Sequence, residues 1–177
     1  MDERLFTVPR KLIRDYGTRD PFRLAEELGY PVKFMDTQRQ KGFCKKILNH
    51  YFIFINRNMS PEMQRMCCAH EIAHILFHRD YLSTPQYFMH MELFDMRNRT
   101  EYEANLFTAN LLIDEGELAE ALREGKDIVS AAAAFDVNVN LVALKLAELR
   151  KSGLPVTVPF VPDRRFLGQI DDRPDAV

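Results

Sequence analysis

Residues 61–78 constrain the fold of this chain more than any other stretch of the sequence. Ser60 is a suitable N-cap, Pro61 suits a first helical turn, and Glu62 complements the helix dipole, so we expect one helix over 61–78. Its second half, CCAHEIAHILFH, places three histidines and a glutamate among alanine, isoleucine and leucine. A helix this apolar is expected to be buried, and buried polar side chains without partners are costly. The fold must therefore supply partners for these groups.

A metal ion is the partner that the spacing favours. His70 and His74 are four residues apart, so their imidazoles share one face of a helix and can converge on one ion at the ~2.0–2.1 Å of zinc–nitrogen bonds. Glu71 lies part-way round the helix, where its carboxylate can reach a water on that ion. His-Glu-x-x-His is the signature of zinc peptidases, with two ligands and a general base. The same motif arises by chance as two surface histidines, but the apolar neighbours favour the metal site.

A catalytic zinc ion usually has three protein ligands and one open position, and this helix offers two further candidates. His78 lies two turns beyond His70, roughly 12 Å along the axis, which is too far for one ion on a straight helix. Cys67 lies on the same stripe, but three ligands from one helix would crowd one side of the ion. We therefore interpret Cys67 as a small buried side chain, and Cys68 as core.

The remaining candidates are carboxylates on a second helix, expected over residues 100–113. Glu101 and Glu103 both stand in its first turns. The face that continues from Glu101 is mostly small or apolar and suits close packing, so Glu101 is preferred as the third ligand. Asn105, one turn further on, can hydrogen-bond a ligand side chain. For each glutamate the alternative is a solvated helix carboxylate.

The rest of the chain indicates an α+β fold. A short helix is expected over 19–30, with Asp20 as its cap and Gly29 at its end. PVKFMD, GFCKKIL and YFIFIN are typical of three strands, and the short gap between the last two predicts a hairpin. Both faces of the last strand are apolar, so we expect it to be covered on both sides. The sheet is thus predicted to be small and mainly antiparallel, packed with several helices.

Length and composition limit the class of protein. The 177 residues suit one domain, placed at 1–152, followed by a proline-containing segment at 153–177 that we expect to be extended or partly disordered. Three cysteines, two of them adjacent, do not make a disulfide framework. The N-terminus is too charged for a signal peptide, and no apolar run reaches the roughly 18 residues of a membrane span. We therefore expect a cytoplasmic protein, whose net charge of −2 gives no general attraction to nucleic acid.

In the order of its motifs the sequence resembles the ImmA/IrrE-type zinc metallopeptidases. The matching pieces are DPFRLAEELGYPVKF, then KGFCKKILNHYFIFINRNMSPEMQRMCCAHEIAHILFH, then EYEANLFTANLLI. The resemblance spans roughly residues 19–151. Ala73 stands where that family often has glycine, and Thr108 where alanine is common; neither departure affects the metal site. The span between ILFH and EYEAN is longer than in many members.

The resemblance implies a zincin-like fold, with a small sheet beside the two metal helices. It implies one zinc ion held by His70, His74 and Glu101, with Glu71 as the catalytic carboxylate. It further implies an endopeptidase that cleaves a specific transcriptional repressor, often encoded nearby, in a stress response or in phage or mobile-element regulation. Manganese is an alternative metal, since two nitrogens and one oxygen do not exclude it.

Residues 126–151 resemble a helix-turn-helix. DNA recognition would require basic and amide side chains on the second helix. That helix offers only Asn138, Asn140, Lys145 and Arg150 among apolar residues. A helical pair packed on the peptidase core is therefore favoured over direct DNA binding. The alternative function for the whole chain is a non-catalytic regulator or toxin–antitoxin partner that binds a repressor or DNA.

Two further features of the sequence bear on the predicted peptidase activity. The oxyanion of peptide hydrolysis needs a donor besides the metal, and the candidates near the motif are Tyr81, Tyr87, His78 and His90. The strand at 42–48 is flanked by lysines, which commonly guard an exposed sheet edge. Alternatively, this strand borders a substrate cleft and pairs with an extended peptide.

Overall fold

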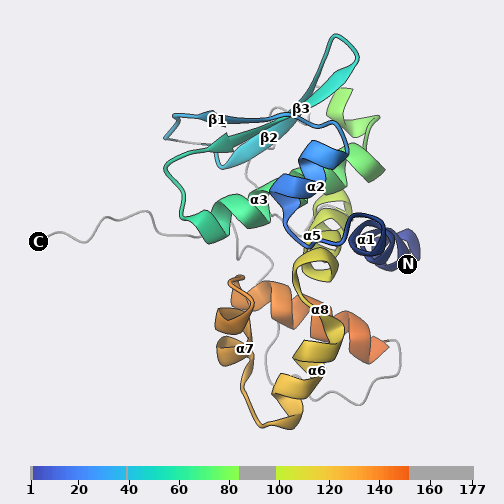
Figure 1. Ribbon diagram of the computed structural model, residues 1–177, viewed down its shortest axis with the longest axis vertical. Coiled ribbons are helices and arrows are strands. Elements are labelled where there is room, and N and C mark those ends of the chain that lie inside the picture. Colours follow the sequence, from blue (N-terminus) through green and yellow to red (C-terminus); the bar gives the residue numbers. More distant parts are fainter. Residues whose placement is uncertain (1, 39, 84–98, 152–177) are drawn as a thin grey trace, which may run out of the picture.

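The computed structural model describes residues 2–38, 40–83 and 99–151, and these form an α+β domain. Its elements, in chain order, are α1 (Arg4–Tyr16), α2 (Pro21–Glu27), β1 (Val32–Met35), β2 (Gly42–Ile47), β3 (His50–Asn56), α3 (Pro61–Phe77), the 3-10 turn η1 (Tyr81–Ser83), α5 (Arg99–Leu112), α6 (Glu115–Arg123), α7 (Ile128–Ala134) and α8 (Val139–Lys151). The sheet lies at one end of the molecule and α6, α7 and α8 at the other, with α3 and α5 between them (Figure 1). The segment at 153–177, expected to be extended, lies outside the described residues.

The predicted sheet of about three strands is confirmed, in the order β1-β3-β2. β2 and β3 pair antiparallel over six residue pairs, and β1 pairs parallel to β3 over four. The hairpin between β2 and β3 turns through Leu48 and Asn49, which both have positive φ, at 47° and 67°. Two consecutive residues with positive φ are typical of the tight turns whose twist matches that of the strands. Antiparallel pairing therefore predominates, as expected, although the sheet is mixed.

The two faces of β3 are buried to different degrees. Ile53 and Ile55 point into the core and are fully buried. Phe52 and Phe54 on the opposite face are half-buried, and the ring of Phe54 stacks on that of Phe43 in β2, with centroids 4.7 Å apart. The sheet thus packs one face against the helices and covers the other partly with its own aromatic rings.

Helix α3 is the centre of the domain. It begins as the sequence predicts, with Pro61 in the first turn and the Ser60 side chain accepting a hydrogen bond from the Met63 backbone N–H. Every residue from Met66 to Ile75 is buried. A helix buried on all sides must have neighbours on all sides, and α3 packs against α2, α5, β2 and β3.

Two helices, α1 and α6, go beyond those expected from the sequence. Pro9 stands inside α1, where it removes the hydrogen bond that its own N–H would give to the carbonyl of Leu5. The amide of Asn110 on α5 donates to that carbonyl instead, at 3.0 Å. A partner distant in sequence therefore offsets a residue that argues locally against a helix.

The segment at 126–151 forms the expected pair of short helices, α7 and α8, which pack on each other, while α8 also packs on α5. Asn140 and Lys145 of α8 are buried, at 8% and 3% exposed. The Lys145 ammonium donates to the carbonyl of Ile113, just past the end of α5, and burial lowers the pKa of Lys145 to about 8. Lys145 therefore joins α8 to the end of α5, and neither side chain lies on an exposed face.

No single described helix is long and apolar enough to cross a membrane. Within the described ranges, α7 and α8 taken together are the one pair that reaches that length and composition, and they meet at a bend of 112°.

The close approach of β2 to α3 yields a prediction about Gly42. A Cβ atom at this position would lie 2.3 Å from the Cys67 sulfur and 2.8 Å from the backbone oxygen of Phe54. We expect Gly42→Ala to lower the free energy of unfolding by about 1–3 kcal/mol, because overpacking forces the strand and helix apart. Urea unfolding followed by circular dichroism measures this change.

The double variant Gly42→Ala, Cys67→Ala is the internal control for that measurement. Removing the sulfur relieves one of the two close contacts, so the double variant should be destabilised by less than the two single variants added together. Wild-type stability of Gly42→Ala would show that β2 and α3 are not in such close contact.

Candidate metal centre

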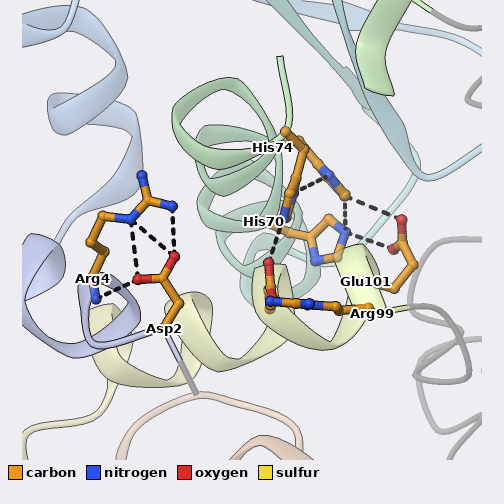
Figure 2. Close-up of polar contacts among 8 residues, drawn as sticks. Asp2, Arg4, His70, His74, Arg99 and Glu101 are labelled. Atoms are coloured by element: carbon orange, nitrogen blue, oxygen red, sulfur yellow. Dashed lines mark hydrogen bonds and ion pairs between the residues drawn. The ribbon is translucent and has the colours of Figure 1, made fainter. Parts of the chain in front are cut away.

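The structure brings His70 and His74 of α3 together with Glu101 from the first turn of α5. The Nε2 atoms of the two histidines are 2.9 Å apart. One Glu101 oxygen lies 3.2 Å from His70 Nε2, and the other lies 3.3 Å from His74 Nε2. All three side chains are buried, and Figure 2 shows them pointing toward one another across the two helices. Of the two glutamates weighed from the sequence, Glu101 is the one that faces the histidines.

A hydrogen bond on the side of the His70 ring away from Glu101 determines which ring nitrogen carries the proton. His70 Nδ1 lies 3.1 Å from the side-chain oxygen of Asn105, one turn further along α5 than Glu101. A carbonyl oxygen only accepts, so Nδ1 carries the proton and Nε2 presents a lone pair to Glu101 and His74. Asn105 thus has the contact with a histidine that its spacing from Glu101 predicts. A lone pair facing a carboxylate oxygen at 3.2 Å is repulsive unless a proton or a cation lies between them.

Glu101 is an anion in this environment. Burial raises the pKa of Glu101, but the neighbouring His70 and His74 outweigh burial and bring this pKa well below its usual range. The centre therefore combines one negative oxygen ligand with two imidazole nitrogens.

These residues fit a divalent metal ion. Their donor atoms all lie within 4.8 Å of one another. Ligand atoms about 2.0–2.1 Å from a tetrahedral zinc ion are separated by about 3.3 Å, close to the distances between these donors. Two nitrogens and one carboxylate oxygen form the donor set of many catalytic zinc sites, which leave one position open.

Glu71 lies on the same buried turn of α3, directly after His70, and is 1% exposed. This exposure distinguishes it from the solvated helix glutamate that a chance occurrence of the motif would give. A carboxylate inside the protein next to a metal centre is a candidate base, since burial there strengthens its electrostatic effects.

The other candidate ligands lie elsewhere. The Cys67 sulfur packs against Gly42 of β2, and burial raises the pKa of the Cys67 thiol. Glu103 lies 3.1 Å from His78 Nε2 and not at the centre. Two of the candidate oxyanion donors, Tyr87 and His90, lie outside the described residues. Tyr81 is half-buried, and the centroid of its ring is 6.4 Å from that of His74.

The contact between His78 and His74 was not predicted from the sequence. This residue ends α3, and its Nδ1 lies 3.1 Å from Nδ1 of His74. Burial, followed by the neighbouring His74, lowers the pKa of His78 to about 4, although Glu103 opposes this shift. The available signal was its spacing of four residues from His74, the same spacing that pairs His70 with His74.

Comparison with known families agrees with this geometry. Two histidines one turn apart and a glutamate from a second helix define a candidate mononuclear metal centre. The family model described as the IrrE N-terminal-like domain, peptidase family M78, matches residues 25–147. The chain belongs to this family, which indicates a metallopeptidase. The search among curated proteins gives no match.

The donor set leads to a prediction about metal content. We expect one zinc ion per chain in the purified protein. In His74→Ala the zinc affinity should fall by more than ~100-fold, because losing a residue that only hydrogen-bonds a ligand already costs ~10–100-fold and losing the ligand itself costs more. Elemental analysis after dialysis measures the occupancy. His50→Ala, which removes an exposed histidine on β3, should retain the metal. Full zinc occupancy of His74→Ala would exclude this ligand set.

Proposed function

We propose that this protein is a zinc-dependent endopeptidase that cleaves a specific transcriptional repressor in a stress response or in phage or mobile-element regulation. The observation that carries the proposal is the buried group of His70, His74 and Glu101, with Glu71 beside it, in a member of a peptidase family. A protein that only bound a repressor would have no need for a buried glutamate beside two metal-binding histidines.

The proposed mechanism divides the chemistry among these residues. A bound zinc ion would polarise the scissile carbonyl and lower the pKa of the attacking water. His70 and His74 of α3 and Glu101 of α5 would hold that ion. Glu71 takes the proton from the attacking water and passes it to the leaving amine. Because Glu71 is almost fully buried, little solvent competes for this proton.

Tyr81 is our candidate for the donor to the developing oxyanion. Of the two described candidates, His78 already has both ring nitrogens within 3.1 Å of other side chains, His74 and Glu103. Tyr81 lies in η1, just after α3, with its ring near that of His74 and its side chain half-buried. A phenol at that position can donate to an oxyanion, as the mechanism requires.

The substrate segment is proposed to lie along β2. This strand stands at one end of the strand order, and in the described residues its pairing is with β3. β2 also contacts α3, which carries the motif. A peptide laid beside β2 would receive affinity from backbone pairing with little demand on its sequence, and the lysines of β2 would favour an acidic neighbourhood.

Specificity would then come from docking the remainder of the repressor. The helices α7 and α8 offer a surface for this, because Val129 of α7 is 63% exposed. Such a surface would recognise a folded partner, which short peptides do not provide. The lysines of β2 retain the alternative role of guarding a sheet edge.

The role of Glu71 is tested by Glu71→Gln. We expect this variant to retain zinc and fold, and to lose cleavage of the repressor by ~10²–10⁴-fold, because the amide cannot accept the proton from the attacking water. Gel-based cleavage of a candidate repressor, sought among the genes beside this one, measures the rate. The matched control is Glu120→Gln on an exposed position of α6. Cleavage at the wild-type rate in Glu71→Gln would reject the mechanism, and no cleavage by the wild type would favour a non-catalytic regulator.

The narrow-substrate proposal makes a separate prediction. We expect efficient cleavage of the intact partner repressor at one site, beside poor activity on casein and on short peptides that span the scissile bond. Mass spectrometry of the products, with and without zinc, measures the number of sites and the metal requirement. Comparable digestion of unrelated unfolded proteins would show that docking does not determine specificity.

A further inference from the structure

The geometry points to a hydrogen-bonded relay, formed by His78, Glu103 and Arg99, that holds His74 in its metal-binding orientation. The inference rests on the proposed metal centre and assigns these three residues as positioning residues for it. They lie on the outer side of His74, away from Glu101, and connect this ligand to the N-terminal turn of α5.

The contacts form a continuous chain. His74 Nδ1 lies 3.1 Å from His78 Nδ1, and His78 Nε2 lies 3.1 Å from one oxygen of Glu103. The other Glu103 oxygen accepts a hydrogen bond of 2.7 Å from Arg99 Nε. His78 is 7% exposed, so water does not readily replace either contact.

The direction of the two hydrogen bonds made by His78 follows from the Glu103 carboxylate. A carboxylate only accepts, so His78 Nε2 must donate to Glu103. A neutral imidazole has one donor and one acceptor, so His78 Nδ1 must accept. The proton between the two Nδ1 atoms therefore belongs to His74. His74 Nε2 is then left as the nitrogen that presents a lone pair to the metal centre.

His70 reaches the same tautomer by a different route, which makes the relay specific to His74. The partner of His70 is the amide of Asn105, whose side chain offers both an acceptor and a donor. Glu103 offers acceptors alone. The relay also joins the end of α3 to the start of α5, because His78 ends the first helix and Arg99 begins the second.

The relay explains why the sequence carries two glutamates two residues apart. Glu101 faces the centre, and Glu103, further round α5, faces His78. Contacts that orient a metal-ligating histidine typically change metal affinity by ~10–100-fold. Glu103 therefore acts on the metal through His78 and His74 without being a ligand.

The experiment uses the full chain and compares wild type with Glu103→Gln, His78→Ala and the control Glu120→Gln. Zinc affinity is measured by competition with a chromophoric chelator. We expect a loss of ~10–100-fold in Glu103→Gln and in His78→Ala, and none in Glu120→Gln. The glutamine side chain preserves the shape of the glutamate but can donate to His78 as well as accept. It therefore no longer determines which nitrogens of His78 and His74 carry a proton.

A spectroscopic measurement separates positioning from a general loss of packing. In the cobalt-substituted wild type, proton NMR should show two paramagnetically shifted exchangeable signals, one from the Nδ1–H of each ligand histidine. In Glu103→Gln the signal of His74 should broaden through exchange with solvent, while the signal of His70 remains as an internal reference. Urea unfolding of the same samples checks that the variants are folded.

The outcomes distinguish the relay from the proposed function. Wild-type zinc affinity and two unchanged signals in both Glu103→Gln and His78→Ala would overturn the relay and leave the metal centre intact. Equal broadening of both signals would also overturn it, since a general loosening would then be the cause. A wild-type protein that binds neither zinc nor cobalt at His70, His74 and Glu101 would overturn the proposed function and the relay together.

Discussion

The packing of α3 against α5 is the constraint on which the rest of this structure depends. Two imidazoles on one helix and a carboxylate on the other meet in the interior, with their donor atoms about a hydrogen-bond length apart. Such groups are stable there only if a proton or a cation lies between them. The helices must therefore be held in one register, because a shift of one residue would bring other side chains to the histidines.

The surrounding elements hold that register from several sides. Gly42 lets β2 approach α3 so closely that the Cys67 sulfur occupies the space of a side chain. On the other side of α5, Asn110 donates to α1 at the carbonyl released by Pro9. At the far end of α5, Arg19 donates to the carbonyl of Leu111, and Lys145 of α8 donates to that of Ile113. Carbonyls at a helix end have no partner within the helix, so these contacts also fix where α5 ends.

Much of this arrangement was predictable because its signals are local. The caps at Ser60 and Asp20, the strand patterns around the hairpin, and the spacing of His70 and His74 each depend on neighbours within a few residues. They correctly predicted α2, the hairpin, α3, α5 and the pair α7 and α8 to within one or two residues at most ends. The helix α1 was not predictable in this way, since Pro9 argues against it and the compensating donor lies about a hundred residues further along the chain.

The sequence by itself determined that a buried helix would carry two histidines and a glutamate needing partners, and it narrowed the third ligand to two glutamates. Periodicity assigns each residue to a face of its own helix, but it does not indicate which face of α5 packs against which face of α3. Only the tertiary structure decided that Glu101 faces the centre while Glu103 turns to His78, because that outcome depends on how α5 is rotated against α3. The same rotation converts His78 from an unplaced histidine into a contact of His74. The direction of the hydrogen bond between His78 and His74 then follows from the Glu103 carboxylate, which can only accept from His78.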